Sequence, residues 1–387
     1  MAEARLTLPF EQPHPMRLPP TYARLRASTP VARVVTPDGQ LAWLVTSYQA
    51  VEQVLSDPRF GITPPGDATE GDGSSLLQDG PGHARLRRLV GRAFTPRGVA
   101  ALRPRIERLA TDYAAAMVTA GAPADLVADF AAPLSITVIG ELLGVTIENQ
   151  EHFRKLADAA SASDPFAADG VQPWYALAGY LGELVAEKRG KPGEDLISRL
   201  IHVHDAEDGQ LSTEELNNLT LTIIAAGYLT ARNAICVTTI QLTGDGRLAE
   251  FAGSPERVDA ALNEALRLQV GLTGDPFPRW AREDVVLAGT SVSAGDLLLV
   301  RIGAAHRDPA RFDDPDRFQP DRSGPSITFG HGPHHCLGAA LARTEVRAAL
   351  RALALATPAL RVDGRIEELP WAYGSVDAGP LELPVRW

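Results

Sequence analysis

One long apolar pattern dominates the chain and ends near Leu242. Ser212 and Glu215 stand three residues apart at its start, the spacing of an N-terminal capping box, and Gly244 follows its end. About 30 helical residues would be roughly 45 Å long, enough to cross the whole molecule. Because a helix that is apolar on most faces is buried, the pattern predicts a long central helix. Its small or polar insertions, which are candidates for function, are Gly227, Tyr228, Thr230, Arg232 and Asn233.

Apolar periodicity in the rest of the chain predicts a mainly helical protein with a smaller β-rich part. Helices are expected near Tyr22–Ala27, at Ser47–Leu55 and through most of residues 97–195, with breaks near Gly121–Pro123 and Ser163–Gly170. Strands are expected at Val31–Val35, Leu41–Thr46, Phe277–Leu287 and Val292–Val300. Residues 58–78 are rich in Gly, Asp and Pro, which is typical of a loop.

The composition is that of an ordinary soluble globular protein, with 387 residues of which 45% are hydrophobic and 22% are charged. The net charge of −11 argues against a nucleic-acid partner. There is no run of 18 apolar residues and no signal-peptide pattern at the N-terminus, so we expect a cytoplasmic protein outside the membrane. Cys236 and Cys336 make no disulfide framework, and Cys236 lies in an apolar helical run that favours plain packing.

Cys336 stands in a loop of a different kind, Phe-Gly-His-Gly-Pro-His-His-Cys-Leu-Gly, directly before a helical run that starts at Ala339. A thiol at a helix N-terminus lies near unpaired N–H groups and the positive end of the helix dipole. Both favour the thiolate, which is the form that binds a metal. Glycines leave room for a flat, bulky partner to approach the backbone. The loop therefore predicts an anionic sulfur beside a large planar ligand.

Two other readings of this loop are open. A single cysteine is often a small buried hydrophobe. A zinc site is another alternative, because His331, His334, His335 and Cys336 are all possible ligands. Structural zinc sites usually draw on two separated pairs of ligands, however, and Cys236, the other cysteine, has no Cys or His near it in the sequence. Zinc also leaves Phe329 and Gly338 without a role.

The loop resembles the Phe-x-x-Gly-x-x-x-Cys-x-Gly haem loop of the cytochrome P-450 family, with Phe329, Cys336 and Gly338 at matching positions. The resemblance covers essentially the entire chain and implies a single haem-thiolate domain over residues 1–387. It implies a mainly α fold with a smaller β-rich lobe, and haem b buried between the long central helix and the cysteine loop. Cys336 would be the axial thiolate, which pushes electron density onto the iron.

The same resemblance implies residues that hold the haem propionates. His83 and Arg87 share one helix face, and together with Arg279 and His334 they match the family's propionate ligands. On the opposite face, a basic row of side chains would dock an acidic redox partner, although a solvated helix face is the plainer reading. That row is Arg85, Arg88 and Arg92.

The central helix resembles the family's Ala/Gly-Gly-x-Asp/Glu-Thr stretch at Ala226, Gly227 and Thr230, but Leu229 stands at the acidic position. The resemblance implies that Gly227 leaves space for dioxygen and that the Thr230 hydroxyl bonds the distal oxygen or a water. The alternative for Thr230 is a bond to a helix carbonyl. The positions expected to face haem, giving a mainly apolar floor, are Thr222, Ala225, Ala226, Leu229 and Thr230.

Other segments match structural or substrate-binding parts of the family. Glu264, Arg267 and Arg317 match an internal Glu-Arg-Arg network that would support the cysteine loop. Segments expected to surround the substrate are residues 58–78, the break at Ser163–Gly170 with Phe166, Trp174 and Tyr175, the turn at Leu272–Pro276, and Trp371–Val376.

The resemblance implies a soluble haem-thiolate monooxygenase or oxidase that receives electrons from a ferredoxin and its NAD(P)H-dependent reductase. The substrate would be a small, largely apolar secondary metabolite, with aromatic character as one option. Because Leu229 cannot relay a proton, radical C–C or C–N coupling stands beside ordinary hydroxylation. A haem protein that senses a ligand without turnover is the alternative from another class.

Overall fold

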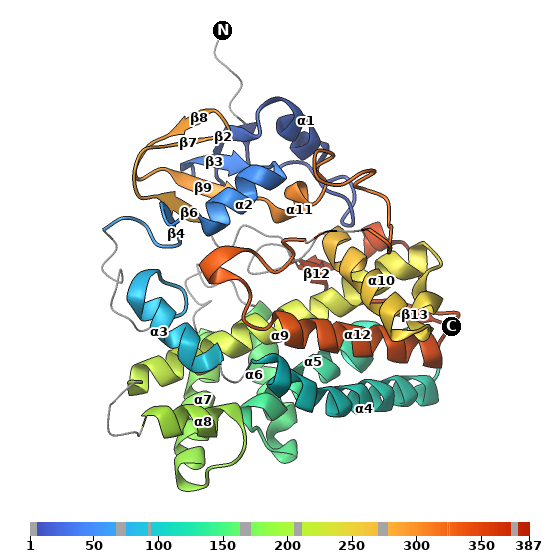
Figure 1. Ribbon diagram of the computed structural model, residues 1–387. Coiled ribbons are helices and arrows are strands. Elements are labelled where there is room, and N and C mark those ends of the chain that lie inside the picture. The colour runs from blue at the N-terminus through green and yellow to red at the C-terminus, as the bar shows by residue number, and fades with distance from the viewer. Residues whose placement is uncertain are drawn as a thin grey trace.

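The computed structural model of the protein describes residues 6–66, 75–91, 94–162, 172–204, 211–269, 278–322, 324, 326–372 and 378–387. A large helical body carries a smaller sheet-rich lobe beside the N-terminus (Figure 1). This arrangement confirms the predicted fold class, which is mainly α with a smaller β-rich lobe.

The helices follow the predicted order along the chain. Their bounds are α1 Pro20–Ser28, α2 Tyr48–Ser56, α3 Gly80–Gly91, α4 Pro96–Ala120, α5 Ala132–Leu143, α6 Gln150–Ala162, α7 Gln172–Gly190, α8 Leu196–His204, α9 Thr213–Gly244, α10 Pro255–Leu268, α11 Ile302–Ala305 and α12 Ala339–Ala356.

The sheet lobe is built around one sheet whose six strands lie in the order β1-β2-β3-β9-β6-β4. Strand β3 pairs in parallel with β9, so the N-terminal hairpin joins a strand from much later in the chain. The bounds are β1 Leu6–Thr7, β2 Val31–Val35, β3 Leu41–Val45, β4 Phe60–Gly61, β5 Ala124–Asp125, β6 Arg279–Ala281, β7 Val285–Leu287, β8 Thr290–Val292, β9 Leu297–Val300, β10 Arg361–Val362, β11 Trp371–Ala372, β12 Gly379–Pro380 and β13 Pro384–Arg386.

Helix α9 is the predicted central helix, and its 32 residues cross the body. Ser212 and Glu215 form the predicted capping box, since each side chain bonds the other's backbone N–H. By length and composition alone α9 could span a membrane, but 78% of its most apolar stretch is buried within the fold. It packs against α5 and α12, as expected of a core helix.

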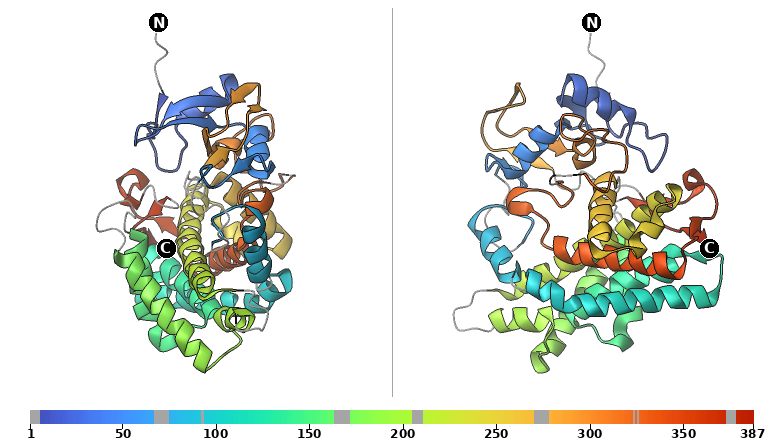
Figure 2. Two further views of the ribbon diagram at one scale, coloured as in Figure 1. Left: turned by 90° about the vertical axis from the view of Figure 1, so that its left-hand side faces the viewer. Right: turned by 45° about the vertical axis from the view of Figure 1, so that its right-hand side comes forward.

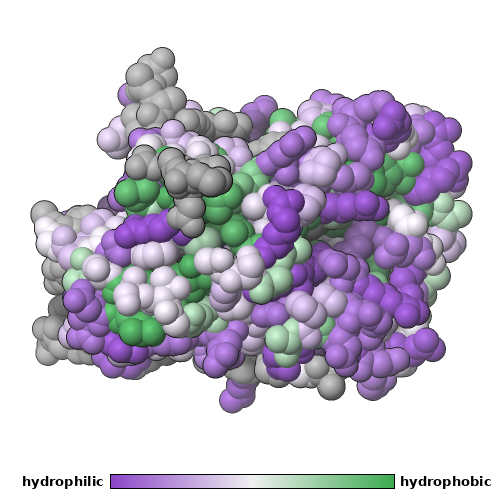
Figure 3. Space-filling model, turned by 90° about the horizontal axis from the view of Figure 1, so that it is seen from above, coloured by the Kyte–Doolittle hydropathy of each residue, from purple (hydrophilic) through white to green (hydrophobic). Residues whose placement is uncertain are grey.

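The loop before α12 lies between the two parts of the molecule. Figures 1 and 2 show this orange segment below the sheet lobe and above the helical body. It contacts α2, and α12 then runs along α4 and α9. Seen from above, the protein surface is mostly hydrophilic, with apolar side chains gathered in smaller patches (Figure 3).

Candidate active site

Backbone hydrogen bonds hold the Cys336 loop in shape. The Cys336 amide donates to the Phe329 carbonyl at 2.8 Å, which closes the loop just before α12. Gly332 adopts φ +72°, and a Cβ there would collide with the Leu55 carbonyl at the end of α2. A Cβ at Gly338, in contrast, would meet nothing within 4 Å. Glycine at position 332 therefore permits the loop to pack closely against the end of α2, whereas no described atom lies close to the backbone at Gly338 on the side where a Cβ would point.

Cys336 is an exposed residue, but protein atoms crowd its thiol closely. Burial raises the pKa of the thiol above its ordinary value, while the Gly338 amide and the charges of Arg87 and Arg343 act in the opposite direction. The Gly338 amide at the helix terminus acts in the predicted direction, but burial outweighs it in the protein alone. A metal cation bound at the sulfur would supply the missing positive charge, since a coordinating thiol is deprotonated.

The zinc alternative finds no support in the geometry. Among the described residues, which include the whole of 326–338, no group of three or more His, Cys, Asp or Glu side chains is placed to hold a metal ion. His334 is instead engaged with a carboxylate, at 2.8 Å from Asp79.

The structure brings the predicted propionate ligands around one place. The rings of His83 on α3 and His334 in the loop lie 4.2 Å apart between centroids. Arg87, one turn after His83, donates to the carbonyl of His335. Arg279 begins β6 and is 5% exposed. These side chains come from α3, β6 and the cysteine loop, which are far apart in sequence.

Burial is the main cause of the shifted pKa values of His83 and Arg279 in this cluster. Burial, with smaller contributions from neighbouring His334 and Arg87, lowers the pKa of His83 to about 4, so His83 is neutral at pH 7. Burial also lowers the pKa of Arg279 to about 10, although nearby Asp79 opposes this change. Arg279 therefore remains a buried cation at pH 7, which suits a carboxylate partner.

Asp79 is a site residue that the sequence did not reveal. Its carboxylate accepts hydrogen bonds from the Ile62 amide at 2.7 Å and from Arg282 at 2.9 Å, in addition to its contact with His334. In the sequence it is only an acidic residue before a glycine-proline helix start. Its partners lie in three separate segments, and only the fold brings them together.

Helix α9 exposes a narrow stripe although most of its residues are buried. Of the positions predicted to face haem, Ala226 is exposed, and Thr222, Ala225 and Thr230 are half-buried. Leu229 is 7% exposed, so it packs within the protein rather than on the stripe. The Thr230 hydroxyl donates to the Ala226 carbonyl at 2.6 Å, which is the helix bond weighed above.

Gly227 has a packing contact that the sequence did not indicate. A Cβ at this position would lie 2.9 Å from Cδ1 of Ile139 on α5. Glycine therefore allows α5 to pack closely on α9, whatever else it does.

Comparison with known proteins identifies the family. A family model described as Cytochrome P450 matches residues 256–354. Mycinamicin IV hydroxylase/epoxidase from Micromonospora griseorubida is 39% identical over 98% of this chain and 98% of its own. Nocardicin C N-oxygenase from Nocardia uniformis subsp. tsuyamanensis is also 39% identical, with the same coverage. The solved structure of the proposed thioether synthase SgvP, from the tailoring step of griseoviridin, has a TM-score of 0.91 at 36% identity, covering 100% of both chains.

The chain belongs to the cytochrome P450 family.

Cytochromes P450 bind haem b, and the described residues fit that group. The loop offers an exposed cysteine residue, and a Cβ at neighbouring Gly338 would meet nothing within 4 Å. Buried Arg279 and the paired histidine rings offer donors for carboxylates. The stripe on α9 offers small side chains toward open space.

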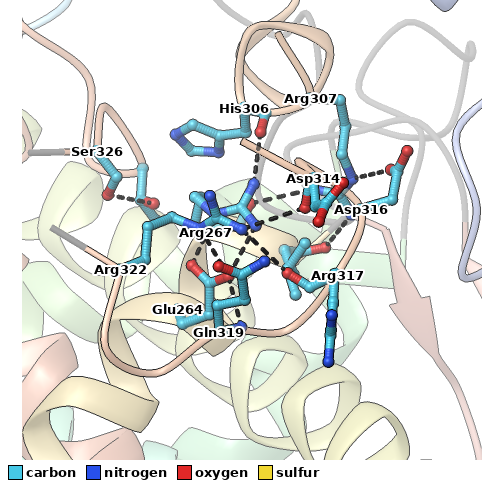
Figure 4. Close-up of polar contacts among 12 residues, drawn as sticks. Glu264, Arg267, His306, Arg307, Asp314, Asp316, Arg317, Gln319, Arg322 and Ser326 are labelled. Atoms are coloured by element: carbon cyan, nitrogen blue, oxygen red, sulfur yellow. Dashed lines mark hydrogen bonds and ion pairs between the residues drawn. The ribbon is translucent and has the colours of Figure 1, made fainter. Parts of the chain in front are cut away.

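The internal network of this cytochrome P450 contains a different arginine from the predicted one. Glu264 accepts two bonds from Arg267, at 2.7 and 2.9 Å, and a third from Arg322 at 3.1 Å. Arg317 is exposed, and Figure 4 shows its side chain pointing away from Glu264. Only its carbonyl participates, by accepting from Arg322. The assignment of Arg317 was wrong because the chain turns after it and carries Arg322 back toward Glu264.

The predicted docking row is smaller than expected. Arg85 forms an ion pair with Glu215, the capping residue of α9, so its charge is already compensated. Arg88 is exposed on α3. Arg92 lies outside the described residues.

Several predicted substrate contacts of this cytochrome P450 also lie outside the described residues, namely Phe166, Leu272–Pro276 and residues 373–376. Trp174 and Tyr175 lie in the first turn of α7, where Tyr175 is 68% exposed. Trp371 is half-buried on β11 and donates to the Ile366 carbonyl at 3.2 Å.

Proposed function

We propose that this cytochrome P450 is a haem-thiolate monooxygenase of secondary metabolism, a single domain over residues 1–387 with Cys336 as the iron ligand. The observation that carries this proposal is the Cys336 loop, which is closed onto Phe329 with Cys336 exposed and two arginines nearby. Bound haem supplies the activation of dioxygen. The chain's own residues bind and orient it, and Arg87, Arg279, His83 and His334 are the proposed ligands of its carboxylates.

Thr230 and Gly227 are the proposed residues of the oxygen pocket. The Thr230 hydroxyl donates its own hydrogen to Ala226, so its oxygen lone pairs are free to accept a bond from a water or from substrate. Gly227 keeps α9 close to α5 at the same turn. The two residues would thus fix the position of one hydrogen-bond acceptor, the Thr230 hydroxyl oxygen, beside the stripe.

Oxygen insertion into a small, largely apolar molecule is the reaction we favour. The accessible stripe of α9 carries alanine and threonine side chains and no charge. The mycinamicin and nocardicin enzymes, which are named for hydroxylation, epoxidation and N-oxygenation, support this choice. The proposed electron donors are a ferredoxin and its NAD(P)H-dependent reductase, in the cytoplasm.

Oxidative bond formation without oxygen insertion is a second candidate. Leu229 occupies the position of the family's acid and is buried, so it cannot relay a proton. A substrate with its own acidic O–H or N–H could supply protons, and C–C or C–N coupling of an aromatic molecule is one such reaction. SgvP, as a proposed thioether synthase, supports bond formation on this fold.

The ferrous carbon-monoxide complex of the purified holoenzyme tests the thiolate assignment. We expect the far red-shifted Soret band of thiolate haem, and Cys336→His should abolish it while haem stays bound. A globin-like spectrum of the wild type would overturn the assignment. Substrate-dependent consumption of NAD(P)H with purified ferredoxin and reductase separates an enzyme from a ligand sensor, because a sensor forms no product.

A further inference from the structure

One carboxylate joins three distant segments beside the proposed haem site. Asp79 lies immediately before α3. Its Oδ2 accepts from the Ile62 amide at 2.7 Å and from Arg282 at 2.9 Å, and its Oδ1 contacts Nε2 of His334 at 2.8 Å. Because an ionised carboxylate only accepts, Nε2 of His334 must carry the hydrogen. Asp79 thereby fixes the orientation of that ring, and His334 can donate to a haem carboxylate only when its Nδ1 also carries a hydrogen.

A glycine in β4 makes room for one of these partners. A Cβ at Gly61 would lie 2.5 Å from the guanidinium of Arg282 and would overlap it. The small residue therefore lets Arg282 lie against the strand and reach Asp79. Gly61 precedes Ile62, so the strand end provides both a backbone donor and the space for a side-chain donor.

Asp79 is also a negative charge close to several of the proposed haem ligands. Although burial raises the pKa of its carboxyl, the bonds from His334, Ile62 and Arg282 outweigh burial and hold the pKa well below its usual range. Asp79 also acts on the pKa of His83 and of Arg279, so its charge reaches two more proposed haem ligands. Its carboxyl group is therefore ionised at neutral pH.

The geometry points to Asp79 as a positioning residue of the haem-carboxylate site, which holds His334 and Arg282 in place and fastens the end of β4 to the cofactor cluster. This inference rests on the proposed role of His334 and its neighbours as haem ligands. It adds that Asp79 couples haem binding to the position of the β4 segment. Because such coupling is reciprocal, bound haem should stabilise this segment, and the segment should stabilise bound haem.

Asp79→Asn in the holoenzyme tests the link. Asparagine has one acceptor oxygen in place of two, so the contact with His334 and the two bonds to Oδ2 cannot all be kept. We expect haem transfer to an excess of apomyoglobin to become roughly tenfold faster or more, as for other outer partners of a ligand. Hydrogen exchange of the Ile62 amide should accelerate, and the reduction potential should become more positive because a nearby negative charge is removed.

Asp296→Asn is a matched control. Asp296 is half-buried in the sheet lobe, just before β9, and accepts from Trp43 at 2.7 Å and from the Ser293 amide at 3.0 Å. Its loss should lower stability without changing haem transfer, the potential or exchange at Ile62. Equal changes in both aspartate variants would reduce Asp79 to a stabilising residue and overturn the inference.

If Asp79→Asn does not fold, Gly61→Ala tests the same coupling, because it disturbs Arg282, a partner of Asp79, and leaves Asp79 itself unchanged. The added methyl displaces only the flexible end of Arg282, so the fold should survive and haem transfer should still accelerate. Wild-type haem transfer in folded Gly61→Ala and Asp79→Asn proteins contradicts the positioning role. If Arg279→Leu loses haem and these variants do not, only the inference fails; if Arg279→Leu also keeps haem, the proposed site itself fails.

Discussion

Glu345 on α12 accepts a hydrogen bond from the hydroxyl of Ser135 on α5, with 2.6 Å between the oxygens. Neither side chain is more than 3% exposed. Burial raises the pKa of Glu345 from 4.5 to about 7, and the bond from Ser135 opposes this only in part. A carboxyl in the core, where α5 and α12 both contact α9, is therefore partly protonated at neutral pH.

Stability should consequently fall as pH rises from about 4.5 to about 7. In that window the folded protein binds the Glu345 proton more tightly than the unfolded chain, so raising the pH favours unfolding. Glu345→Gln cannot ionise and should flatten this part of the profile, with a difference on the order of 2 kcal/mol between pH 5 and pH 8. Urea unfolding of both holoenzymes at several pH values measures it. Parallel profiles for wild type and variant would show that Glu345 does not titrate there.

Replacement of Arg322 by leucine should destabilise the protein far more than the same change at Arg317. Arg322 is one of two arginines on buried Glu264, so its loss leaves a buried charge poorly compensated, at a cost of roughly 3–5 kcal/mol. Arg317 is exposed, and its side chain should contribute within about 0.5 kcal/mol. Thermal unfolding of the two variants decides between them. A larger effect at Arg317 would restore the original assignment.

This network illustrates what the sequence could predict. Glu264 and Arg267 lie one turn apart on α10, so helical spacing alone indicates their contact. The third member depends on how the loop folds back, with Asp314 in the left-handed region at φ +43°. Sequence spacing carries no information about such a turn, so the sequence pointed to Arg317 as the third member and not to Arg322.

For the rest of the fold and the site, too, local patterns were predictable from the sequence and contacts between distant segments were not. Periodic patterns gave the central helix and its capping box correctly, and the cysteine loop was found from its motif. Asp79 escaped because its three partners are distant in sequence. The sequence also did not predict the desolvation of Cys336 or the contact of Gly227 with Ile139, because both arise from the packing of distant segments around these residues.

Arg279→Leu should produce a protein that loses haem. Arg279 is buried, so its replacement removes a charge-assisted partner from a haem carboxylate, at roughly 2–5 kcal/mol. Haem content after gel filtration measures the loss, and Arg87→Leu should act in the same direction. Arg33→Leu, on an exposed strand position of the same sheet, is the control and should keep its haem. Full occupancy in the Arg279 and Arg87 variants would remove both from the site.

Arg88→Glu should slow electron transfer from the ferredoxin. Arg88 is exposed on α3, the helix that also carries Arg87 beside the cysteine loop. Reversing its charge should weaken attraction to an acidic partner, and added salt should slow the wild type in a similar way. Stopped-flow reduction measures both effects. Arg361→Glu, an exposed charge reversal on β10, should leave the rate unchanged, and equal rates in all three proteins would place docking elsewhere.

The last prediction concerns the chemistry at Leu229. A buried leucine at the acidic position leaves Thr230, water and the substrate as the remaining routes for protons. Oxygen insertion, which we favour, requires one atom of labelled dioxygen in a monomeric product, and mass spectrometry after turnover detects it. An unlabelled, coupled product would instead support oxidative bond formation with protons from the substrate.

Substitution of Leu229 by aspartate distinguishes the proton routes further. If delivery through water limits oxygen insertion, the new carboxylate should raise the product formed per NAD(P)H consumed; if the substrate supplies the protons, that yield should stay the same or fall. Leu229→Asn, similar in size and polarity but a poor acid, is the matched control, because a gain shared by both variants would arise from altered packing and not from a proton.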